Sequence, residues 1–163
     1  MQKISRHKTR DCLFQALYSK INLQDSFLQE SFLDNFYEWN LGFLDQVYFE
    51  EMFAWIIENE GKLVYIIEKF APKFDISSMS VINIIPAFIA SYEMLYLKCD
   101  SVPENVSINE ALELVKLYSD PQWRIFINWV LNSLKQSKTE VKKELSKITN
   151  KNLFFKNYDQ KKS

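Results

Sequence analysis

Chain-breaking residues are scarce in this sequence: its 163 residues include only two glycines and four prolines. A protein made of many short strands needs frequent tight turns, and most turns use these two residue types. Together with a hydrophobic fraction of 47%, this scarcity predicts an all-α fold. The length is sufficient for one domain with its own core and too short to expect two.

The clearest helical pattern lies in residues 107–118. Ser107 precedes Glu110 by three residues, the spacing of a capping box, so a helix is predicted to begin at Ser107. Apolar residues then recur at three- and four-residue steps, which gives this helix one buried face. Ser119 or Asp120 is expected to cap a further helix with Pro121 in its first position, where the missing N–H costs nothing.

The same periodicity predicts about seven helices along the chain. Pro86 lies inside the fifth, so that helix either kinks there or begins only there. Residues 76–92 carry no charge but fall short of the roughly 20 apolar residues of a membrane span, which favours a buried central helix. Residues 98–105 are predicted to form a loop, which is expected to separate two helical subdomains that pack as one body. The predicted helices cover residues 5–22, 26–39, 44–60, 62–71, 78–98, 107–118 and 121–147.

Charge is segregated along the chain although the net charge is only −1. Residues 1–20 hold five Lys or Arg and one acid, and residues 135–163 hold nine Lys and three acids. Residues 21–61 hold nine acids and no Lys or Arg, so an acidic, aromatic-rich segment separates two basic ends. Some of these acids are expected to face a basic partner. Most rings of this segment are predicted to be core: Phe27, Phe32, Phe36, Tyr37, Trp39, Phe43, Tyr48, Phe49, Phe53 and Trp55.

The two cysteines, Cys12 and Cys99, show no paired spacing, which is typical of a reducing compartment. Both are expected to be small buried residues. No apolar segment of a secretory signal follows the first charged residues, so a cytoplasmic protein is predicted.

The first candidate binding element is the basic N-terminus. Lys3, Arg6 and Arg10 are separated by three and four residues, with His7 adjacent, so the three cations project from one face if the helix begins early enough. Such a face neutralises phosphates, and guanidinium groups also stack on unpaired bases. The alternative is a solvated, frayed terminus.

The second candidate element follows Pro121. Gln122, Arg124 and Phe126 cluster with Trp123 at a helix start, where aromatic rings and a guanidinium stack bases and hold phosphate. The alternative for Phe126 and Trp129 is a core position, and for Trp129 the core is favoured.

Enzymatic sites find little support in the residue types present. Two glycines permit neither a dinucleotide fingerprint nor a phosphate-binding loop, and one histidine permits no His-based triad or zinc cluster. No catalytic residue, metal or cofactor is therefore expected, and the protein is predicted to act by binding.

Four segments together resemble the NusB family of bacterial transcription antitermination factors. They occur in the family's order: RHKTRDCLFQALY at 6–18, VYFEEMFAWI at 47–56, ASYEML at 90–95, and the pattern VP, INEALELVK and FINWVL within 102–131. The resemblance implies a single all-helical RNA-binding domain over residues 1–148. The composition of residues 149–163 predicts a lysine-rich disordered tail, and such tails are more often solubilising than specific for RNA. The resemblance also implies boxA-type single-stranded RNA, the ribosomal protein NusE and the transcription elongation complex as partners, in support of ribosomal RNA transcription.

Residue roles carried over from the family agree with the two candidate elements. The family's Arg-rich N-terminus contacts RNA, which favours that role for Lys3, Arg6, His7 and Arg10. Phe126 matches a family Phe implicated in RNA contact, and Asn128 matches the family's Asn. Tyr92 and Glu93 fall on its central Tyr-Glu pair, for which packing is expected.

Three departures from the family support an alternative. Trp55 and Trp129 stand where the family commonly has Gly, and Phe88 stands where it has Arg. A protein-interaction module that keeps the fold but has lost specific RNA recognition is therefore the second hypothesis, and an enzyme accessory subunit the third. Monomer and dimer are both compatible with the sequence.

Overall fold

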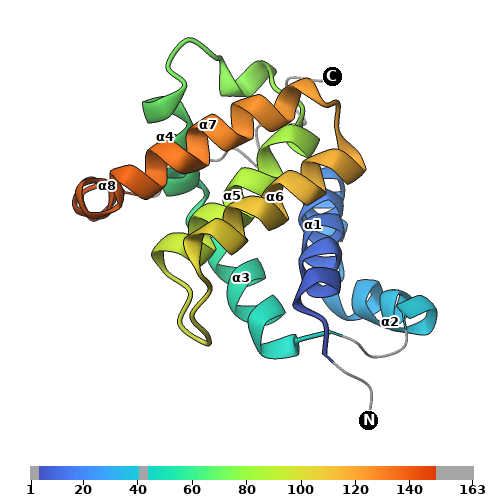
Figure 1. Ribbon diagram of the computed structural model, residues 1–163. Helices are drawn as coiled ribbons and strands as arrows, with labels where there is room; N and C mark the ends of the chain where they lie inside the picture. The colour runs from blue at the N-terminus through green and yellow to red at the C-terminus, as the bar shows by residue number, and fades with distance from the viewer. Residues whose placement is uncertain (1–3, 41–43, 150–163) are drawn as a thin grey trace.

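All regular secondary structure in the described part of the chain is helical. The computed structural model describes residues 4–40 and 44–149, and within these ranges there is no strand (Figure 1). The predicted all-α fold is confirmed, with eight α-helices in these ranges where about seven were expected. They are α1 (Arg6–Leu23), α2 (Gln29–Asn40), α3 (Gln46–Glu58), α4 (Glu60–Phe70), α5 (Val81–Leu95), α6 (Glu104–Tyr118), α7 (Gln122–Gln136) and α8 (Lys138–Leu145), with short 3₁₀ turns η1 (Gln24–Ser26) and η2 (Ile76–Ser78).

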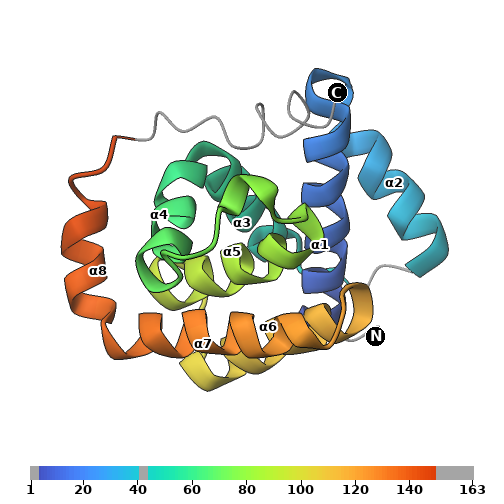
Figure 2. The same cartoon turned by 90° about the horizontal axis from the view of Figure 1, so that it is seen from above.

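Helix α5 is the centre of the molecule. Every residue of it except Ile82 is buried, and α1, α3, α4, α6 and α7 pack around it (Figure 2). Because most side chains of α5 are apolar and α5 is buried on nearly all sides, its burial contributes to the hydrophobic stabilisation of the fold. The helix begins at Val81 and continues past Pro86, so the alternative in which it begins only at Pro86 is excluded. None of the described helices is long and apolar enough to cross a membrane.

The aromatic side chains of the acidic segment pack largely inward, as predicted. Tyr48, Phe49 and Phe53 are buried on α3. Four further rings are partly buried against the same core: Phe27, Phe32, Phe36 and Trp55. Phe43 and the side chains of Tyr37 and Trp39 lie outside the described part of the chain.

Both predicted caps in the C-terminal half are wrong. Helix α6 begins at Glu104, three residues before Ser107, and Pro103 is its N-cap residue. Ser107 is buried and its hydroxyl donates to Glu93 Oε2 at 2.6 Å, so this hydroxyl is engaged by a side chain of α5. At the start of α7, Pro121 is the N-cap residue, and neither Ser119 nor Asp120 supplies a side-chain cap.

The predicted helix over residues 121–147 is two helices. The helix is interrupted at Ser137, whose φ of −110° and ψ of 18° lie outside helical geometry. From there α8 turns away from α7 and packs on α4 (Figure 2). Glu144 of α8 fixes this packing by accepting from the Tyr65 hydroxyl at 2.7 Å and from Lys69 Nζ at 2.9 Å. The tail predicted from residue 149 lies, from residue 150 onward, outside the described residues.

The two cysteines have different environments. Cys12 is buried in α1, as predicted, and burial raises the pKa of its thiol to about 12. Cys99 is exposed in the loop between α5 and α6, so the prediction of a buried residue is wrong for it. The helical pattern that was extended to residue 98 ends at Leu95, which leaves Cys99 outside the core.

Candidate nucleic-acid interface

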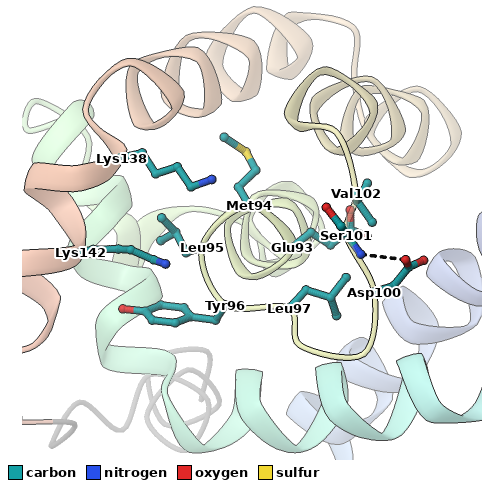
Figure 3. A pocket seen from close by; sticks show the side chains of 10 residues that line it. All are labelled: Glu93, Met94, Leu95, Tyr96, Leu97, Asp100, Ser101, Val102, Lys138 and Lys142. Carbon is teal, nitrogen blue, oxygen red and sulfur yellow. Dashed lines mark hydrogen bonds between the residues drawn. The ribbon is translucent and has the colours of Figure 1, made fainter.

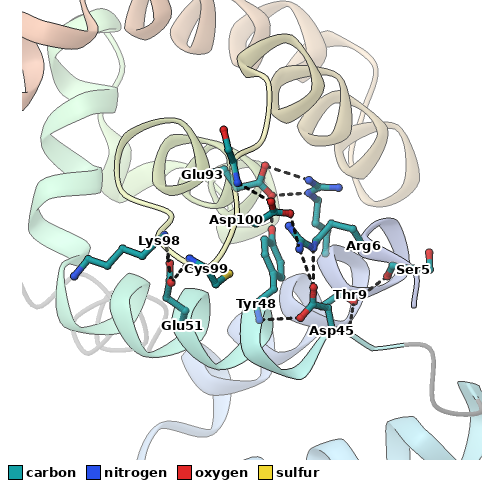
Figure 4. A network of polar contacts seen from close by, with 12 residues as sticks. Ser5, Arg6, Thr9, Asp45, Tyr48, Glu51, Glu93, Lys98, Cys99 and Asp100 are labelled. Atoms are coloured by element: carbon teal, nitrogen blue, oxygen red, sulfur yellow. Dashed lines mark hydrogen bonds and ion pairs between the residues drawn. The ribbon is translucent and has the colours of Figure 1, made fainter. Parts of the chain in front are cut away.

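The start of α1 is fixed by a cap and by an ion-pair network shown in Figure 4. The Ser5 hydroxyl accepts from the backbone N–H of Lys8 and so begins the helix. Arg6 is the first residue of the helix, and its guanidinium donates to Asp45 Oδ2 from Nη2 at 2.8 Å and from Nε at 3.2 Å; Nη2 also donates to Asp100 Oδ2 at 3.1 Å. It lies over the Tyr48 ring, 4.3 Å from the centroid. Arg6 is thus held by α3 and by the loop after α5.

Arg10 lies in the protein interior, which corrects the expectation that it projects with Arg6 from an exposed face. Its Nε donates to Glu93 Oε1 at 2.6 Å and its Nη2 to Glu93 Oε2 at 3.2 Å, while its side chain is only 5% exposed. The Tyr48 hydroxyl also donates to Glu93. Burial alone disfavours the charged form of Arg10, but the hydrogen bond and charge of Glu93 raise the pKa of its guanidinium.

Glu93 therefore does more than the packing role expected for it. Its carboxylate accepts from Arg10 of α1, Tyr48 of α3 and Ser107 of α6, so one buried side chain joins three helices to α5. Burial and the adjacent charge of Glu93 raise the pKa of Tyr48 well above its ordinary value, which keeps the phenol protonated as a donor.

His7 is the most exposed of the three described residues predicted for the N-terminal element, Arg6, His7 and Arg10. Its side chain is 62% exposed, and Nδ1 lies 2.7 Å from Glu110 Oε2 on α6. A groove of about 260 Å³ runs between α1 and α6 beside it, lined by His7, Asp11, Glu113, Leu114, Lys116 and Leu117. Lys3, the remaining residue predicted for this element, lies outside the described residues.

The loop between α5 and α6 is tied to α3. Glu51 accepts from the backbone N–H groups of Lys98 at 2.9 Å and Cys99 at 3.0 Å (Figure 4). It also accepts from the Tyr92 hydroxyl at 2.7 Å. Partial burial opposes ionisation of this carboxylate, but the three hydrogen bonds prevail and lower its pKa. The same loop carries Asp100 to Arg6.

A polar hollow of about 230 Å³ lies where α5 ends, beneath this loop (Figure 3). Lys138 and Lys142 reach into it from the α8 side. Lys138 Nζ pairs with Glu104 Oε1 at 2.9 Å, and Lys142 Nζ lies 5.4 Å from the centroid of the Tyr96 ring. Cations at the C-terminal end of a helix offset its partial negative charge, which is a sufficient structural reason for both lysines.

The second candidate element occupies the first turns of α7. Gln122 and Arg124 are exposed, and Phe126 is partly buried. The Phe126 ring contacts Phe74 edge to face at 4.9 Å and Trp123 at 5.5 Å. Gln122 and Phe126 are four residues apart and lie on one surface of α7, whereas Arg124, two residues from each, projects from the opposite side of the helix. Because α6 packs on both α1 and α7, it connects this surface to the N-terminal element.

Trp129 contradicts the prediction of a core position. Its side chain is on the outer surface of α7 with 62% of the residue exposed, and its Nε1 donates to the Phe70 carbonyl at 2.9 Å. Trp55, the other tryptophan at a family Gly position, is partly buried between Tyr92 and Tyr96, with centroids 4.5 and 4.8 Å away. Phe88 is fully within the core.

Several residues of the network were not identified as site residues from sequence: Asp45, Tyr48, Asp100 and Glu110. They lie between 39 and 103 positions away from the cations that they contact. The N-terminal run of Lys and Arg could not reveal them. Groups of His, Cys, Asp and Glu that could hold a metal are absent from residues 4–40 and 44–149.

At the level of fold class, this is an all-helical protein built around a buried central helix, and a solved structure shares the arrangement. The structure titled as NusB of T. maritima superposes with a TM-score of 0.68 at 23% identity, covering 90% of this chain and all of that one. The model of the NusB family matches residues 7–136. The chain belongs to the NusB family.

Curated relatives agree with this family assignment. The protein named transcription antitermination protein NusB from Clostridium botulinum is 32% identical over 133 residues, covering 82% of this chain and 96% of the relative. The protein of the same name from Clostridium perfringens is 35% identical over 133 residues, covering 80% of this chain and 96% of the relative. The matches therefore span nearly the whole of both relatives.

Proposed function

We propose that this protein is an RNA-binding transcription antitermination factor that binds boxA-type single-stranded RNA together with the ribosomal protein NusE, in support of ribosomal RNA transcription by the elongation complex. The family match over residues 7–136 carries the proposal. The relatives named as antitermination proteins support it, because nearly their full length aligns with this chain.

In this proposal RNA contacts come from two groups of side chains. Arg6 and His7 at the start of α1 act together with Lys3, which precedes them in sequence, and Gln122, Arg124 and Phe126 act on α7. Arg124 is exposed, so it is available for phosphate without breaking a buried ion pair. Arg10 contributes indirectly, because its pair with Glu93 holds α1 against α5 and so positions Arg6 and His7.

The acidic segment supplies the surface for a basic protein partner such as NusE. Asp45 and Glu51 are engaged within the molecule, but Asp34, Glu50 and Glu58 are exposed on α2 and α3. Complementary charge at such positions chiefly accelerates encounter and sets orientation.

The test is binding of a fluorescent boxA-type RNA and a scrambled RNA, with and without NusE from the same organism, over a salt series. Tighter binding of boxA, strengthened by NusE, is expected. Arg124→Ala should weaken binding and reduce the salt slope by about one. Lys143→Ala, an exposed cation on α8, is the matched control and should change neither specificity nor NusE enhancement.

One observation favours the second candidate, a protein-interaction module without specific RNA recognition. Arg6 is paired with two acids and Arg10 is buried against a third, so the two described N-terminal arginines are both engaged. Equal binding of boxA and scrambled RNA, with NusE binding intact, would favour this candidate over the first.

A further inference from the structure

Large apolar side chains are exposed along the outer surface of α7. Ile125 is 78% exposed and Trp129, one turn later, is 62% exposed. Phe74, in the connection between α4 and α5, is 51% exposed and contacts Phe126. Exposed aromatic residues that lie together mark an interaction site more often than isolated ones do. We call Phe74, Phe126 and Trp129 the aromatic ridge.

Trp129 is fixed in place although it is exposed. Its Nε1 donates to the Phe70 carbonyl at the end of α4, so the polar edge of the indole is already satisfied inside the molecule. A partner therefore gains nothing by offering an acceptor to this group, and the exposed part of the ring is left for stacking or apolar contact. A ring held before binding loses little conformational entropy when a partner arrives.

Charge around the aromatic ridge favours a polyanion. Helix α7 contains Arg124 and Lys135 and no acid over its whole length, and Lys73 is exposed next to Phe74. Asp75, the acid on the other side of Phe74, is occupied at the start of η2, where it accepts from the backbone N–H of Ser77 at 2.9 Å and from its hydroxyl. Asp120 precedes α7 by two residues and is the nearest acid before it in sequence.

Polar side chains interrupt the apolar ones on this helix. Gln122 and Asn128 are exposed on α7 and Asn132 is partly exposed, and the Asn132 amide donates to Asn128. A stable interface between protein copies has a continuous, charge-poor apolar centre. Aromatic rings set among cations and amides are instead typical of surfaces that stack single-stranded bases.

We propose that Trp129 and Phe74 form a base-stacking site for single-stranded RNA, which extends the Phe126 contact along α7 and toward η2. The proposal rests on the proposed RNA-binding function and adds two residues to it. Phosphates of the stacked strand are neutralised by Lys73, which is exposed beside Phe74, and Arg124 adds to the positive charge of α7. The ligand chemistry is an unpaired nucleobase, and the site is tolerant of base identity because every base has a π face.

Tryptophan fluorescence tests stacking directly. A variant with Trp39→Phe, Trp55→Phe and Trp123→Phe retains Trp129 as its sole tryptophan. Titration with boxA-type RNA is expected to quench its emission, whereas heparin, a polyanion without bases, should bind through charge and leave the emission unchanged. Equal effects of RNA and heparin, or no quenching at saturating RNA, would overturn the proposal.

Affinity measurements on otherwise unchanged protein provide the second test. Trp129→Ala and Phe74→Ala are each expected to weaken RNA binding at least about fivefold, with the salt slope unaltered. Ile125→Ala is the matched control, because it removes a similarly exposed apolar side chain that cannot stack on a base. The RNA affinity of this variant should stay within about twofold of that of the unaltered protein.

The outcomes separate this proposal from the proposed function. Undiminished RNA binding by Trp129→Ala and Phe74→Ala overturns the stacking site and leaves the antitermination role standing. Absence of RNA binding by the unaltered protein, with and without NusE, overturns both. An equal loss with Ile125→Ala also overturns stacking, because it shows a general apolar contact of the kind a protein partner makes.

Discussion

Arg10 of α1 and Glu93 of α5 face each other inside the protein, with Nε 2.6 Å from Oε1 and the two side chains 5% and 0% exposed. Such a pair is costly to break on one side only, because the remaining charge stays buried without its partner. The pair makes the packing of α1 on α5 specific. An apolar side chain at position 10 or 93 would leave the remaining buried charge without a hydrogen-bonding partner.

Glu93→Ala should lower the free energy of unfolding by about 3–5 kcal/mol, because it leaves the Arg10 guanidinium uncompensated and removes the acceptor of Tyr48 and Ser107. Urea denaturation followed by circular dichroism measures this loss. Glu113→Ala on the exposed side of α6 is the control and should change stability by less than about 0.5 kcal/mol. Equal stability of the two variants would show that the buried pair contributes no specific stabilisation.

Asp100→Asn should increase RNA affinity. The exposed Asp100 carboxylate shares the Arg6 guanidinium with Asp45, and an exposed pair contributes up to about 1 kcal/mol, so its removal should strengthen phosphate binding by up to about fivefold at low salt. Fluorescence anisotropy with labelled RNA measures the change. In a protein that also carries Arg6→Ala, Asp100→Asn should raise RNA affinity much less. An equal gain in affinity there would show that the effect comes from the change in net charge and not from release of Arg6.

Acid stability should depend on Glu51. Its pKa is lowered in the folded protein, so the unfolded chain binds this proton at a higher pH than the native protein does. Its contribution is fully present above the ordinary carboxyl pKa and is lost as the pH falls through the lowered folded value. Denaturation at neutral pH and near pH 3.5 should therefore show a smaller acid-induced loss in Glu51→Gln than in the unaltered protein. Parallel losses would exclude this linkage.

Thiol titration should distinguish the two cysteines. Cys99 is exposed and Cys12 is buried with a pKa raised to about 12, so a thiol-specific disulfide reagent should modify one thiol in the native protein and two in denaturant. Partial desolvation and the nearby charge of Glu51 raise the pKa of the Cys99 thiol, so its reaction should be slower than that of a free cysteine at the same pH. Cys99→Ser should abolish the native reaction.

The sequence predicted helix positions well because apolar periodicity reports burial directly. The central α5, the buried rings of α3 and the end of α6 at Tyr118 follow from it. The start of α6 was not predicted correctly. Ser107 fits the sequence pattern of an N-cap, but its hydroxyl donates to Glu93 of α5. A local motif does not reveal a partner brought in by tertiary packing.

The candidate site was predicted less completely for the same reason. The spacing of Arg6 and Arg10 places them on one side of α1, but whether that side faces solvent depends on Asp45 and Glu93, which are remote in sequence. Trp129 was assigned to the core because tryptophan is usually buried. Its indole instead lies over the end of α4, where the Phe70 carbonyl provides an acceptor.

The break at Ser137 determines where the second basic region of the chain is attached. Because α8 turns onto α4, it stands at the side of the molecule opposite α1 in both views (Figures 1 and 2). The lysines of α8 and Arg6 at the start of α1 therefore lie on opposite sides of the molecule. A strand bound beside Arg6 would have to cross the body of the protein to reach α8, so a short ligand held there does not contact the α8 lysines.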